Sequence, residues 1–126
     1  MVEIKPQRRV NPQDMEAQEK YYARAVSTGT TNLDRLAYLI ANQSTVRKAD
    51  CLAVLEALQH NIADELSQGR IVQLGSFGNF QIGVRSEGVE TPDLVSTSSI
   101  KQARLHFRPG TEFRNLLKTV RFKKAS

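Results

Sequence analysis

The chain has 126 residues and 40% hydrophobic content, so it is one domain by size and can fill only a modest core. Its formal net charge of +5 favours a polyanionic partner, without choosing between nucleic acid, acidic lipid and acidic protein. The single cysteine excludes an internal disulfide, no apolar run approaches membrane-spanning length, and residues 1–10 lack a signal-peptide core. We therefore expect a cytoplasmic protein with no membrane partner.

The N-terminal segment is predicted to form a β-hairpin. Residues 2–10 have an extended pattern, in which Pro6 should confine the strand to a sheet edge. A turn is expected over 11–14, and residues 21–28 have strand composition. A similar strand is expected at 119–123, so the three strands are predicted to form one small accessory sheet.

Two amphipathic helices are predicted next. The first begins at a cap formed by Thr31 or Asn32, and the second begins after Ser44 and Thr45 and stops before Gly69. Apolar residues recur at a spacing of three and four along both, which predicts two stripes that belong to the core. The stripes consist of Leu33, Leu36, Ala37, Leu39 and Ile40 in the first helix and Val54, Leu55, Leu58, Ile62 and Leu66 in the second.

Strands are predicted over residues 71–74, 79–85 and 100–107, with an irregular segment over 86–93. Along the last strand, side chains should alternate between two faces. One face would carry Lys101, Ala103, Leu105 and Phe107, and the other Gln102, Arg104, His106 and Arg108. Pro109 and Gly110 should then stop the strand and open a short helix that contains Phe113, Leu116 and Leu117.

Glycines and phenylalanines alternate closely between the first two of these strands. Gly75 and Gly78 allow a sharp chain reversal, while Phe77 and Phe80 are driven into an apolar core. By itself this spacing is equally compatible with an ordinary tight hairpin in a small α+β domain.

The segment Ile-Val-Gln-Leu-Gly-Ser-Phe-Gly-Asn-Phe at 71–80, followed by Phe-Arg-Pro-Gly at 107–110, resembles the signature of the HU/IHF family of bacterial histone-like proteins. The resemblance covers residues 31–118, with 1–30 and 119–126 as added segments. It implies an α+β, HU/IHF-like fold: a two-helix hairpin, an antiparallel sheet with a long arm, and a short C-terminal helix, in an intertwined homodimer. It also implies a nucleoid-associated protein that condenses double-stranded DNA largely independently of sequence.

The sequence gives little support for an enzyme. His60 and His106 have no second ligand at metal spacing, and Cys51 has no nearby partner to activate it. No glycine-rich phosphate loop or nucleophile elbow is present. We therefore predict no catalytic residues, metal, cofactor or small-molecule substrate.

Positive charge is concentrated near the C-terminus, where residues 100–126 hold eight basic side chains against Glu112 alone. Arg104 and Arg108 alternate on one strand and Arg85 lies on its predicted neighbour, so the three should point the same way. Such a row can hold phosphates without reading bases, although a solvated outer sheet face also needs polar residues.

The arm departs from the family pattern. The family clamps the minor groove with basic arms, each tipped by a wedge proline after Arg-Asn. Here Arg85 is the only basic residue of 81–99, against Glu87, Glu90 and Asp93, and Pro92 lacks the Arg-Asn pair. Gly83 also replaces a residue that is usually basic. These departures and the N-terminal hairpin make the chain look like the divergent HU-like branch found in Bacteroidetes.

The N-terminal hairpin offers a substitute for the arm tip, because Arg8, Arg9, Asn11 and Pro12 nearly reproduce the family's pattern there. Asn-Pro is also a common turn dipeptide. The alternative function is an HU-fold scaffold that binds protein partners and has weak or lost DNA binding. The candidate DNA-binding residues are Arg8, Arg9, Asn11, Pro12, Arg85, Pro92, Lys101, Arg104, Arg108, Arg114 and Lys118.

Overall fold

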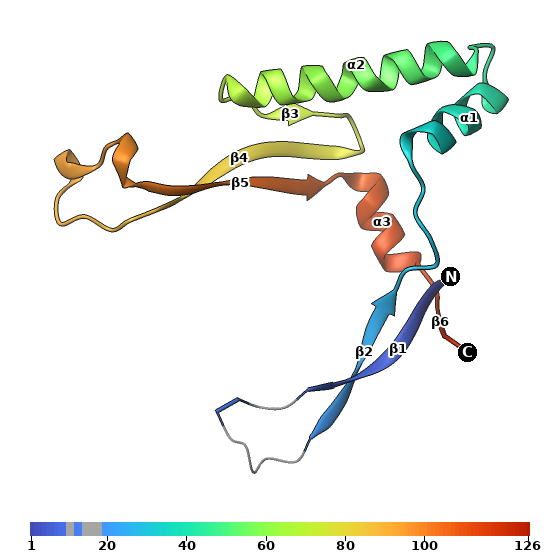
Figure 1. The fold of residues 1–126 in the computed structure, drawn as a ribbon, viewed down its shortest axis with the longest axis horizontal. Coiled ribbons are helices and arrows are strands. Elements are labelled where there is room, and N and C mark those ends of the chain that lie inside the picture. Colours follow the sequence, from blue (N-terminus) through green and yellow to red (C-terminus); the bar gives the residue numbers. More distant parts are fainter. Residues whose placement is uncertain (10–11, 14–18) are drawn as a thin grey trace.

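The structure is a computed structural model that describes residues 1–9, 12–13 and 19–126. It confirms the predicted α+β class, with two three-stranded sheets ordered β2-β1-β6 and β3-β4-β5. Figure 1 shows an open arrangement in which two hairpins project from a body formed by the helices. The elements in chain order are β1 (Val2–Arg9), β2 (Lys20–Val26), α1 (Leu33–Gln43), α2 (Lys48–Ser67), β3 (Val72–Gln73), β4 (Gly78–Ser86), the 3-10 turns η1 (Pro92–Leu94) and η2 (Thr97–Ser99), β5 (Ile100–Pro109), α3 (Thr111–Thr119) and β6 (Phe122–Lys124).

Helix α1 begins at the predicted cap. The side-chain oxygen of Asn32 accepts a 2.9 Å hydrogen bond from the backbone N–H of Arg35, which satisfies one free donor of the first turn. Helix α2 begins at Lys48, after Ser44 and Thr45 as predicted, and the Ser44 hydroxyl accepts a hydrogen bond from the Val46 amide in the turn that precedes it.

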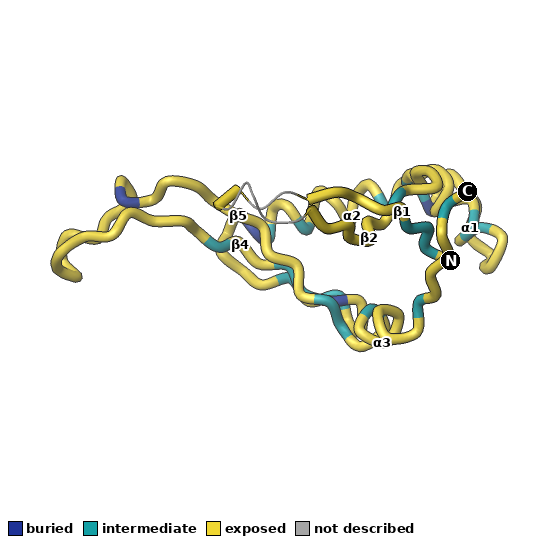
Figure 2. The backbone as a smooth tube through the Cα atoms, turned by 90° about the horizontal axis from the view of Figure 1, so that it is seen from below, coloured by how far each residue is buried: buried dark blue, intermediate teal, exposed yellow. Residues whose placement is uncertain are grey.

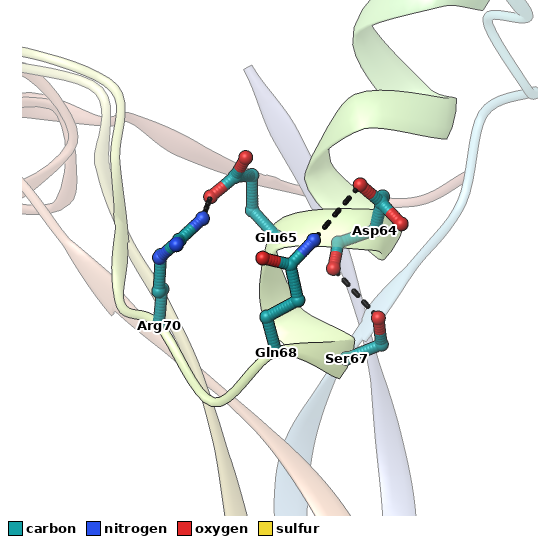
Figure 3. A network of polar contacts seen from close by, with 5 residues as sticks. All are labelled: Asp64, Glu65, Ser67, Gln68 and Arg70. Carbon is teal, nitrogen blue, oxygen red and sulfur yellow. Dashed lines mark hydrogen bonds and ion pairs between the residues drawn. The ribbon is translucent and has the colours of Figure 1, made fainter.

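The end of α2 is fixed by a glycine and a polar network. Gly69 has a φ of +83°, and its N–H donates to the Leu66 carbonyl at 3.0 Å, so the predicted stop is confirmed. Just beyond, Arg70 forms a 2.7 Å ion pair with Glu65, and the Gln68 amide donates to Asp64 at 3.1 Å (Figure 3). The charge of Arg70 is thus paired within the body.

Sheet β3-β4-β5 has one polar and one apolar face. Strands β4 and β5 are antiparallel, with Phe80 opposite Phe107 and Ile82 opposite Leu105. Strand β5 extends past the predicted end at residue 107, because Pro109 still pairs with Gly78. The rings of Phe80 and Phe107 lie 4.9 Å apart and those of Phe77 and Phe113 4.6 Å apart, so one aromatic cluster joins the sheet to α3.

The tight turn before β4 packs directly on the start of α3. Gly78 has a φ of +148°, and a Cβ built there would lie 2.5 Å from the Arg108 carbonyl oxygen. A Cβ built on Gly110 would overlap the Ser76 carbonyl, while the Gly110 N–H donates to the Phe77 carbonyl at 3.0 Å. Both glycines are therefore required by close backbone approach.

Gly110→Ala should lower the free energy of unfolding by about 1–3 kcal/mol or more, because its Cβ meets backbone that cannot move aside cheaply. Gly88→Ala is the matched control, since nothing lies within 4 Å of a Cβ at that position. Urea unfolding followed by circular dichroism measures both variants. Equal stability of the two would contradict the close packing of the turn on α3.

The accessory sheet forms as predicted, with β1 antiparallel to β2 and parallel to β6. The expectation that Pro6 makes β1 an edge strand is wrong for its first residues, because β1 is the middle strand where Val2 and Ile4 pair with β6. Pro6 lies beyond that paired segment, so its missing N–H costs no bond to β6. Thr119 belongs to α3, and the last strand begins only at Phe122.

The predicted core is largely uncovered in the single chain. Among the described residues only Ala37, Cys51 and Leu66 are buried apolar side chains, while Phe107 is 44% exposed. Most of the backbone is drawn as exposed in Figure 2. Ala37 and Leu66 of the predicted stripes are thus buried, whereas two long projections and a thin body leave no second layer over stripe residues such as Val54.

Candidate nucleic-acid interface

A row of arginines lies on the polar face of β4 and β5. Directly opposite residues of an antiparallel pair share a face, and the register sets Arg108 opposite Asn79, Arg104 opposite Gly83, and Arg85 opposite Gln102. The three arginines are exposed, and none takes part in an ion pair within the described residues. The predicted common direction of Arg85, Arg104 and Arg108 is thus confirmed.

The same face explains Gly83. A Cβ built on Gly83 would lie 2.5 Å from Nε2 of His106, so the imidazole lies over the glycine. A long basic side chain at this position would compete with His106 for the same space. The row is therefore interrupted on β4 and continued by β5.

Arg108 and Arg114 are brought together in a polar groove of about 560 Å³. Its lining also includes Asn79 and Thr111, and the Arg114 guanidinium lies 3.5 Å from the Thr111 hydroxyl. The groove opens at the first turn of α3, where the helix dipole favours negative charge. Its chemistry is that of an anion site.

The other predicted basic residues of this part lie apart from the row. Lys118 is one helical turn beyond Arg114 on α3 and is exposed. Lys101 is the extra residue at a register shift, because Ser86 pairs with Ile100 while Arg85 pairs with Gln102. It therefore lies at the outer end of the β4–β5 ribbon, next to the loop formed by residues 87–99.

The loop that joins β4 to β5, at the outer end of the arm, is acidic. Pro92 is exposed and opens the turn η1, and Asp93 follows it. A hydrogen bond to the Thr91 side chain, and then one to the Asp93 backbone, lower the pKa of the Asp93 carboxyl below its ordinary value. This charge next to Pro92 therefore persists as the pH falls below neutral.

The structure separates the two arginines that precede the N-terminal turn. Arg8 forms a 3.2 Å ion pair with Glu19, whereas the Arg9 guanidinium lies 5.2 Å from the centre of the Tyr22 ring. Strand alternation sets them on opposite faces of β1. Pro12 lies in an exposed turn, and Asn11 lies outside the described residues.

Two further kinds of residue were considered for chemistry: Cys51 as a nucleophile, and His, Cys, Asp and Glu side chains as metal ligands. Cys51 is 4% exposed, and its thiol lies 4.0 Å from the Val46 carbonyl. Within residues 1–9, 12–13 and 19–126, no group of three or more His, Cys, Asp or Glu side chains could hold a metal ion. No helix in the same ranges is long and apolar enough to cross a membrane.

Comparisons with known proteins agree with this architecture. A family model described as HU-HIG, an HU domain fused to a wHTH, Ig or glycine-rich motif, matches residues 2–124. No curated protein matches the sequence.

Two solved structures share the fold. The Anabaena HU–DNA cocrystal structure has a TM-score of 0.56 and 27% identity, over 71% of this chain and 100% of that one. A candidate DNA-binding protein from Bacteroides vulgatus has a TM-score of 0.63 and 14% identity, over 98% of this chain and 48% of the other. The present chain thus spans about half the length of the Bacteroides protein.

Proposed function

Because the chain belongs to the HU-HIG family of HU domains, we propose that it is an architectural protein of the nucleoid that binds double-stranded DNA largely independently of sequence. The observation that carries this proposal is the row of Arg85, Arg104 and Arg108 on one sheet face, none of which forms an ion pair within the described residues. Guanidinium groups on a β-ribbon can hold phosphate oxygens without reading base edges. The HU–DNA cocrystal among the similar structures supports the same reading.

We further propose that the protein acts as a homodimer. The chain exposes 10831 Å², whereas a compact monomer of its 14.1 kDa mass would expose about 6,700 Å². The excess includes the uncovered aromatic cluster and the stripes of α1 and α2. A second copy would cover this surface at the scale of an obligate interface. Sedimentation should therefore give a dimer mass, and a concentration-independent monomer mass would overturn the homodimer.

Gel-shift titration of duplex DNA at two salt concentrations tests the proposed function. Tight binding at low salt that weakens steeply at higher salt is expected, because each neutralised phosphate releases counterions. Two duplexes of unrelated sequence should shift at similar protein concentrations. Absence of any shift at low salt would overturn DNA binding.

The arm favours a second candidate function, a scaffold that binds protein partners. Its end carries Glu87, Glu90 and Asp93, which phosphate would repel, next to the exposed apolar side chains of Leu94 and Val95. A charged and apolar mixture of this kind fits a protein surface better than a DNA groove. Absence of DNA binding at low salt would favour this candidate.

Pro12 is the better candidate for a wedge between base pairs, if either hairpin tip enters DNA. Unstacking costs a few kcal/mol and needs nearby cations to hold the bent backbone. Pro92 is followed by the ionised Asp93, whereas Pro12 follows Arg8 and Arg9. Pro12→Ala with Arg9→Ala should therefore reduce bending more than Pro92→Ala does, as measured by energy transfer across an end-labelled duplex. A larger loss from Pro92→Ala would assign the wedge to the arm.

A further inference from the structure

The accessory sheet has a basic face that sequence spacing alone does not reveal. The register of β1 and β2 sets Lys5 directly opposite Arg24 and Arg9 directly opposite Lys20. Opposite residues share a face, so these four cations lie together, and Lys123 on β6 joins them next to Glu3. Lys5, Arg9, Lys20 and Arg24 are all exposed and form no ion pair within the described residues.

This arrangement is unfavourable for the free protein. Side chains directly opposite each other have Cβ atoms about 4.5–5.5 Å apart, and like charges in such positions destabilise a strand pair. The hairpin contains two such pairs on one face, on either side of the pair formed by Gln7 and Tyr22. If this face were only solvated, opposite charges at these positions would stabilise the sheet better. Glu3 and Lys123 show such an arrangement, with an ion pair at 3.6 Å.

The other face of the hairpin has the opposite character. Pro6 lies opposite Ala23 and Ile4 opposite Ala25. Ile4, Pro6 and Ala23 line an apolar groove with Tyr21, and Lys124 of β6 lies at the same groove. The one arginine on this face, Arg8, is neutralised by Glu19. Among the described residues of β1 and β2, the cations without an ion pair thus lie on one side only.

We propose that this basic face, formed by Lys5, Arg9, Lys20 and Arg24, is a second contact surface for the phosphate backbone of duplex DNA. The inference rests on the proposed DNA binding and adds a surface separate from the arginine row of β4 and β5. Figure 1 shows the two hairpins as separate projections whose bases flank α3. Phosphates would relieve the repulsion within both like-charge pairs, so DNA binding would offset the electrostatic repulsion that destabilises the free hairpin.

The test compares two double variants of the full chain, each of which removes two positive charges. Lys5→Gln with Arg24→Gln removes one like-charge pair from the basic face. The control, Lys48→Gln with Arg70→Gln, removes two exposed cations that already have carboxylate partners. In a homodimer the first variant should flatten the plot of log affinity against log salt by about 3.6, at about 0.9 for each lost phosphate contact, while the control changes it little.

Thermal unfolding without DNA separates a lost contact from a lost fold. The Lys5→Gln, Arg24→Gln variant should unfold at the wild-type temperature or above it, because the substitution removes repulsion. Equal salt slopes for the two double variants would overturn this inference alone. A wild-type protein that binds no duplex at low salt would overturn the proposed function and, with it, the second surface.

Discussion

Phe80→Ala should lower the free energy of unfolding by about 3–5 kcal/mol, the range of other buried aromatic truncations. The Phe80 ring lies 4.9 Å from that of Phe107, which is 6.2 Å from the ring of Phe113 on α3. Removing Phe80 therefore opens the contact between the sheet and the last helix. The full loss is expected only in the homodimer, where a second copy covers a cluster that one chain leaves half-exposed.

Chemical unfolding at two protein concentrations measures this effect. The wild-type transition should move to higher denaturant as protein concentration rises, because unfolding and dissociation are coupled. Tyr21→Ala is the control, since Tyr21 is 68% exposed on the accessory sheet and lies away from the aromatic cluster. A loss below about 1 kcal/mol for Phe80→Ala would mean that the cluster is not a core.

Helix ends could be predicted where one local contact decides them. Asn32 caps α1 and Gly69 ends α2 as expected, because each acts within its own turn of the helix. The start of α2 could be predicted only to lie after Ser44 and Thr45, since both are good caps and the turn held by Ser44 defers the helix to Lys48. The position of β1 in its sheet depended on a strand more than a hundred residues away in the chain.

The candidate site was predictable in part for the same reason. Alternation within one strand correctly gave Arg104 and Arg108 a common direction, because the period of two is a property of the strand itself. The pairing of Lys5 with Arg24 depends on how the intervening turn sets the register, so the sequence-based set omitted both. Arg8 and Arg9 lie on opposite faces of β1, because neighbouring residues of a strand face opposite sides.

The helical stripes illustrate a different limit. Periodicity shows which face of α2 is apolar, but it does not show what covers that face. Val54 belongs to the predicted stripe and is 65% exposed in the single chain. Apolar stripes that one chain leaves uncovered are expected when the core of a fold is completed by a second copy of the chain. The exposure of these stripes in the single chain thus supports the homodimer that we propose.

Arg104→Gln together with Arg108→Gln should produce a large loss of DNA affinity. A homodimer contains two copies of each arginine, and each copy is expected to make one phosphate contact. Substituting one of the two arginines should therefore flatten the plot of log affinity against log salt by about 1.8, and substituting both by about 3.6. Equivalently, the advantage of the wild type over the double variant should shrink about 150-fold when salt rises fourfold.

The same control, Lys48→Gln with Arg70→Gln, should leave that slope nearly unchanged, because both cations are already held by carboxylates. The effects of the β4–β5 row and of the accessory-sheet face should also add when all four substitutions are combined, since separate contact surfaces couple weakly. An unchanged slope for Arg104→Gln with Arg108→Gln, in a protein that still binds duplex, would remove the arginine row from the interface. DNA binding would then depend on the N-terminal hairpin, whose cations are the other exposed and unpaired set directed to one side of a sheet within the described residues.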